Sequence, residues 1–62
     1  MDGERAELAS VATALEDLTD RVMQLADQSK EEGDDQASVE LFEVERTLRQ
    51  AGRRLDRIVR GN

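Results

Sequence analysis

Arginine side chains offer the clearest chemistry in this sequence, because a guanidinium binds phosphates and carboxylates through paired hydrogen bonds. Arg46, Arg53 and Arg60 recur every seven residues, so on a helix they would form one outward ridge. Arg49 and Arg57 lie beside it. We call these five residues the arginine ridge, which could bind a polyanion such as a nucleic acid. The formal net charge of −6 opposes such binding at long range and disfavours nucleic acid as a partner.

Pairs of neighbouring carboxylates are the other candidates for chemistry. They stand at Glu16-Asp17, Glu31-Glu32 and Asp34-Asp35. Acid–base catalysis would need a carboxylate in a cleft that shifts its pKa, whereas these pairs fall on a wet helix face or in a turn. The spacing of an EF-hand calcium loop is absent as well. These carboxylates therefore predict neither an active site nor a metal site.

Nucleophilic catalysis has no support in the residue types of the chain. There is no Cys and no His, and the single Lys, Lys30, lies in a predicted turn. A Ser or Thr hydroxyl needs a neighbouring base to become a nucleophile. The missing Cys and His also exclude disulfides and the usual zinc sites. We predict that the protein is not an enzyme and uses no cofactor, no metal and no small-molecule substrate.

Length and composition limit the chain to one small domain over residues 1–62. Of its 62 residues, 37% are hydrophobic and 39% are charged. No apolar run approaches the roughly 18 residues of a membrane span, and no signal-peptide pattern is present, so we expect a cytoplasmic protein without a membrane partner. Phe42 is the single aromatic residue, which disfavours a base-stacking platform.

The spacing of the apolar residues predicts two helices. Steps of three and four residues alternate in both halves of the chain, which is a heptad pattern and not the period of two expected for a strand. We call these residues the seam. Its members are Leu8, Val11, Leu15, Leu18, Val22 and Leu25 in the first half, and Ala37, Leu41, Val44, Leu48, Ala51, Leu55 and Ile58 in the second.

A turn at Gly33 separates the two predicted helices. Gly suits the left-handed conformation that follows a helix C-terminus, and Asp34 is a favoured N-cap for the next helix. The sequence therefore predicts an all-α fold, an antiparallel hairpin with a helix at 3–32, a turn at 33–34 and a helix at 35–60. Folding there pairs seam residues whose numbers add to 66, so that Leu18 faces Leu48.

Charged residues beside the seam agree with this antiparallel orientation. In the same register Glu7 lies near Arg54, and Arg21 lies near Glu40. An exposed ion pair contributes little to stability, but several together favour one orientation. We predict these two pairs within the hairpin.

One flank of the seam is rich in small and apolar residues and predicts a surface for a partner. The predicted interface consists of Ala12, Met23, Ala26, Phe42, Gly52 and Val59. Two helices cannot enclose a core, and a second copy is the simplest completion, giving a homodimeric antiparallel four-helix bundle. A marginal monomeric hairpin and a complex with a different protein are the alternatives.

These features favour a non-enzymatic role. We expect a small helical adaptor or regulator that presents an apolar helical face to a protein partner, with a second copy of the chain as the first partner. A nucleic-acid-binding regulator that uses the arginine ridge is the alternative. Steep weakening of binding with salt would distinguish phosphate contacts from apolar association.

Overall fold

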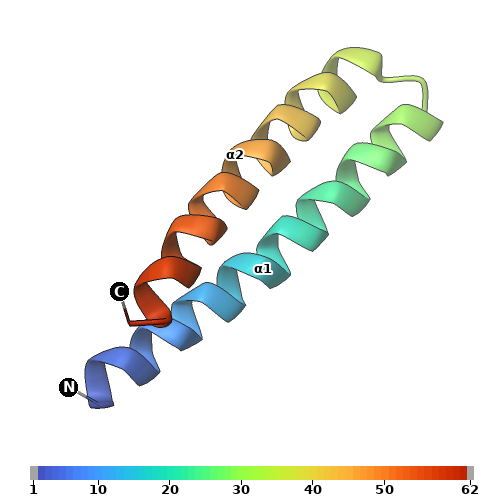
Figure 1. Cartoon of the computed structure of the whole chain (residues 1–62). Coiled ribbons are helices and arrows are strands. Elements are labelled where there is room, and N and C mark those ends of the chain that lie inside the picture. The colour runs from blue at the N-terminus through green and yellow to red at the C-terminus, as the bar shows by residue number, and fades with distance from the viewer. Residues whose placement is uncertain (1, 62) are drawn as a thin grey trace.

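The chain forms a hairpin of two long helices. The computed structural model describes residues 2–61, with the side chain of Asp2 excepted. Helix α1 (Asp2–Glu31) and helix α2 (Asp35–Val59) lie antiparallel, with both ends of the chain at one end of the hairpin (Figure 1). No strand occurs within residues 2–61. The predicted all-α hairpin is confirmed, and the helix ends differ from the predicted ones by at most one residue.

The turn between the helices is built by the two residues that the sequence indicates. Gly33 has a φ of 84°, and its N–H donates to the carbonyl of Lys30 at 3.1 Å. The N–H of Asp34 donates to the carbonyl of Ser29 at 2.9 Å. These two bonds form a Schellman motif that satisfies the last carbonyls of α1. The carboxylate of Asp34 then caps α2 by accepting the N–H of Ala37 at 3.1 Å.

The helices meet in nearly the predicted register. A Cβ atom added at Gly52 would lie 3.9 Å from Cδ2 of Leu15. Near the chain ends, Nη1 of Arg5 donates to the carbonyl of Val59 at 2.9 Å. The numbers of these paired residues add to 67 and 64, close to the predicted 66.

Small and polar side chains occupy the centre of the contact between the helices. Ala26 has no exposed surface, and Thr19 and Ser38 are each 4% exposed. Glu45 is buried as well, and Gly52 follows it by seven residues. Small side chains let two helix backbones approach closely, so this row of each helix turns inward.

Because each helix is rotated so that its small residues face the other helix, the seam is divided into two rows. The prediction that both rows lie at the centre of the contact is therefore wrong in part. One row of large seam residues is half-buried at the contact, namely Leu8, Leu15, Val22, Leu41, Leu48 and Leu55. The other row is 46 to 51% exposed, namely Val11, Leu18, Leu25, Val44 and Ile58. Leu18, which was predicted to face Leu48 at the centre of the seam, is therefore not enclosed within the hairpin. The helices turn their small residues toward each other, which moves the second row out of the contact.

The hairpin has no enclosed hydrophobic core. Among the described residues no large side chain is fully buried, and Ala26 is the one buried apolar residue. The Cα radius of gyration is 14.3 Å, whereas a compact domain of this length has about 11 Å. A single copy of this chain consequently leaves most of its large apolar side chains in contact with water.

Candidate interaction surface

The exposed row of the seam lies along one side of the hairpin, and we call it the apolar face. Its residues are Val11, Leu18 and Leu25 of α1 with Val44 and Ile58 of α2. In both helices each of these residues follows a half-buried one by three positions, which is the same sense of rotation away from the contact. In an antiparallel pair the same rotation turns both rows to one side. The two helices thus present their exposed apolar rows together.

Four charged residues follow the two outer edges of this face, and Glu4 lies beside Val11 at its end. Glu7 and Arg21 lie on α1, and Glu40 and Arg54 lie on α2. Each precedes a residue of the apolar face by four positions, so each lies one turn away beside it. All four are exposed. We call them the edge charges.

The ion pairs predicted between these charges are not formed within the hairpin. Within residues 2–61, the two ion pairs join Arg46 to Glu43 and Arg49 to Glu45. Glu7 and Arg54 border the apolar face from opposite helices, as do Arg21 and Glu40. Because the small-residue row turns inward, the edge charges point to the two outer sides of the hairpin instead of toward each other.

The residues of the predicted interface lie at or beside the contact within the hairpin. Ala26 is completely buried there, and Ala12, Phe42, Gly52 and Val59 are half-buried. Met23, at 37% exposure, is the exposed member of the set. The structure thus uses this flank to join α1 to α2, and it leaves the residues of the apolar face exposed.

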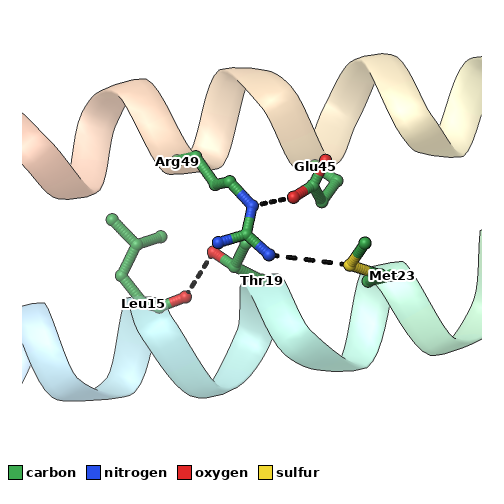
Figure 2. A network of polar contacts seen from close by, with 5 residues as sticks. All are labelled: Leu15, Thr19, Met23, Glu45 and Arg49. Carbon is green, nitrogen blue, oxygen red and sulfur yellow. Dashed lines mark hydrogen bonds and ion pairs between the residues drawn. The ribbon is translucent and has the colours of Figure 1, made fainter.

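A polar network closes the hairpin contact near its middle. Arg49 of α2 reaches toward α1, with an ion pair to Glu45 and with Nη2 3.6 Å from Sδ of Met23 (Figure 2). The hydroxyl of Thr19 donates to the carbonyl of Leu15 at 2.7 Å. No buried side-chain nitrogen or oxygen among the described residues lacks a partner. The network therefore allows polar residues to occupy the contact without an unsatisfied group.

Sequence reasoning missed the burial of Glu45 and Thr19. Glu45 follows Ser38 by seven residues and Thr19 precedes Ala26 by seven, so both share the helix side of the predicted interface residues. The four-residue step from Glu45 to Arg49 is the spacing of an ion pair within a helix. Together these two signals indicate a buried carboxylate with its own counter-ion.

The arginine ridge is split by the structure. Arg46 pairs with Glu43 at 3.5 Å, and Arg49 belongs to the network with Glu45. Farther along α2, an open hollow is lined by Thr47, Gln50, Ala51, Arg53, Arg54 and Arg57. Arg60 is the C-cap of α2, where its backbone N–H donates to the carbonyl of Asp56 at 3.0 Å. Arg53, Arg54 and Arg57 therefore line this hollow together, and Arg49 and Arg53 line a second one beside the helix contact.

Two further properties bear on the candidate site. Within residues 2–61, no group of three or more Asp or Glu residues is arranged to hold a metal ion. In the same part of the chain, neither helix combines the length and apolar character needed to cross a membrane.

Comparison of the chain with protein-family models, with curated proteins and with solved structures gives no match. The apolar face, the edge charges and the arginine-lined hollow are thus the features from which a function can be inferred.

Proposed function

We propose that the protein is a non-enzymatic interaction module, a small helical adaptor or regulator that acts through its apolar face. In this proposal two copies stack face to face as a homodimeric four-helix bundle. The observation that carries it is the exposure of five large aliphatic residues in one strip on a hairpin without an enclosed core. Burying such a strip is the main stabilisation open to a chain of this size.

The division of the seam supports a bundle of four helices. In such a bundle each helix contacts two neighbours, so its apolar positions are shared between them. The half-buried row, which includes Leu15 and Leu48, meets the neighbour within the hairpin. The exposed row, which includes Leu18 and Val44, is oriented for a neighbour from another chain. In a monomeric hairpin the second row of apolar side chains would stay in contact with water and would not contribute to stability.

The elongated shape of the hairpin also suits an extended contact with a partner. The Cα atoms of the hairpin extend over 48 × 15 × 10 Å, so its broad side measures 48 by 15 Å. Specific interfaces bury roughly 800 Å² of accessible surface on each partner. Isolated monomers seldom expose contiguous apolar patches of more than a few hundred Å².

The apolar face is tested by placing a charge at its centre. Leu18→Asp should reduce self-association at least 100-fold, because the carboxylate would be buried without a partner between the two copies. Val39→Asp is the matched control. Val39 is 62% exposed and precedes Val44 by five residues, which places it about 140° around α2 from the face. Sedimentation equilibrium of both variants gives the dissociation constants.

Two results would contradict the proposal. Equal self-association of Leu18→Asp and Val39→Asp would show that the apolar face is not the contact. A chain that stays fully helical and monomeric up to millimolar concentration would show that the hairpin needs no partner. Either result would leave the face without the proposed role.

A second candidate function, binding of nucleic acid, is favoured by the hollow lined by Arg53, Arg54 and Arg57. These side chains could hold phosphates on the outer side of α2. The measurement is binding of generic single-stranded and duplex nucleic acid at low salt. Phosphate contacts predict an affinity that falls steeply as salt rises and falls again in Arg53→Gln/Arg57→Gln. No binding at low salt would remove this candidate.

A further inference from the structure

We propose that the edge charges, Glu7, Arg21, Glu40 and Arg54, make the apolar face selective for a second copy of the same chain. This inference rests on the proposed function, since it assumes that the apolar face is the contact. It adds which residues decide the partner and how they do so.

The order of the edge charges is the same on both helices. On α1 the acid Glu7 precedes the base Arg21 by fourteen residues, and on α2 the acid Glu40 precedes the base Arg54 by fourteen residues. Fourteen residues correspond to about 21 Å along a helix. That separation exceeds the Debye length of about 8 Å at physiological salt, so the two ends of an edge act independently.

This order makes an edge complementary to an antiparallel copy of itself or of the other edge. Because every edge has its acid first and its base second, antiparallel neighbours bring the acid of one near the base of the other. The result holds whether α1 of one copy lies against α1 or against α2 of the second copy. A two-fold symmetric interface needs this self-complementarity, because the same surface serves both partners.

The edge charges are also available for contacts between chains. All four are exposed and none takes part in an ion pair of the described hairpin. A single exposed pair has a small effect, but a dimer would contain four of them, and like charges in the same places would repel. Opposite charge at four positions therefore favours a second copy over an apolar helix pair of another charge pattern.

Two complementary variants test the inference directly. Glu7→Arg/Glu40→Arg makes all four edge charges positive, and Arg21→Glu/Arg54→Glu makes all four negative. Each alone should self-associate roughly 10- to 100-fold more weakly than the unmodified chain at low salt. An equimolar mixture should form a heterodimer at least as tight as the unmodified dimer. Sedimentation equilibrium with one variant carrying a fluorescent label measures all three species.

A matched control separates the edge positions from net charge. Asp20→Arg/Asp27→Arg changes the charge by the same amount as Glu7→Arg/Glu40→Arg, at exposed positions of α1 on the side away from the apolar face. This control should self-associate nearly as well as the unmodified chain. The differences among the variants should shrink in 1 M salt, where charges are screened.

The outcomes distinguish this inference from the proposed function. If both edge variants self-associate like the unmodified chain and show no preference for each other, the edge charges do not select the partner, although Leu18→Asp can still show that the face does. If the mixture stays as weak as the separate variants, the inference is overturned as well. A monomeric unmodified chain would overturn both. Helix content of the mixture, measured by circular dichroism, shows that both variants fold.

Discussion

At the scale of single residues, the burial of Glu45 between the helices has the largest consequence. A carboxylate taken out of water is costly unless an opposite charge and hydrogen bonds accompany it. Arg49 supplies both from one turn along α2, and its side chain remains 48% exposed. The pair of Arg46 and Glu43 has similar spacing but lies at the surface, with side chains 72% and 60% exposed. The two pairs therefore differ mainly in burial.

This difference predicts unequal effects of removing the two arginines. Arg49→Ala should lower the free energy of unfolding by about 1–2 kcal/mol, because Glu45 would lose its charged hydrogen-bond partner. Arg46→Ala, the control, should change it by less than about 0.5 kcal/mol. Urea unfolding followed by circular dichroism, at one fixed protein concentration, measures both. Equal losses in the two variants would mean that Glu45 is not stabilised by Arg49.

At the scale of the helices, the sequence was sufficient for the type, the ends and the register of the elements. The heptad spacing predicts helices whatever they pack against, and Gly33 and Asp34 have conformational reasons to form a turn. The rotation of each helix about its own axis was not predictable in the same way. The rows that contain Leu15 and Leu18 have the same heptad spacing in a two-helix seam and in a four-helix bundle. The spacing alone therefore cannot decide which row faces the other helix.

The candidate site depended on that rotation, which explains why it was predicted only in part. Small residues such as Ala26 and Gly52 indicated a surface of close approach, and the structure uses that approach within the hairpin. Residues such as Leu18 were expected inside, and they form the apolar face instead. The edge charges were recognised beside the seam, but their partners depend on which side of the helix faces outward.

Two glycine substitutions test the packing of the helices and the turn between them, and they should change the free energy of unfolding in opposite directions. Gly52→Ala should raise the free energy of unfolding by about 0.5–1 kcal/mol, since Ala favours the helix and its Cβ would make an ordinary contact with Leu15. Gly33→Ala should lower it by about 1–2 kcal/mol, because a side chain is strained at φ 84°. Thermal and urea unfolding of both variants provides the comparison. A loss in Gly52→Ala would show that the helices are closer there than described.

At the scale of the whole molecule, the two helices are as long as those of a four-helix bundle, but the hairpin buries few of its apolar side chains. Its one buried apolar residue in the described range is Ala26, and an isolated helix pair with so little burial is marginal in water. Stacking two apolar faces would supply the missing burial and leave the hollow beside Arg53 and Arg57 on the outside. Folding and association are then coupled, so the stability depends on protein concentration.

Sedimentation equilibrium of the unmodified chain, combined with circular dichroism over a wide concentration range, shows whether two copies associate and fold together. We predict a species of twice the 7.0 kDa chain mass, and a helix content that falls as dilution dissociates it. A species of 7.0 kDa that keeps its full helix content at every concentration would contradict the account, because the apolar face would then need no partner.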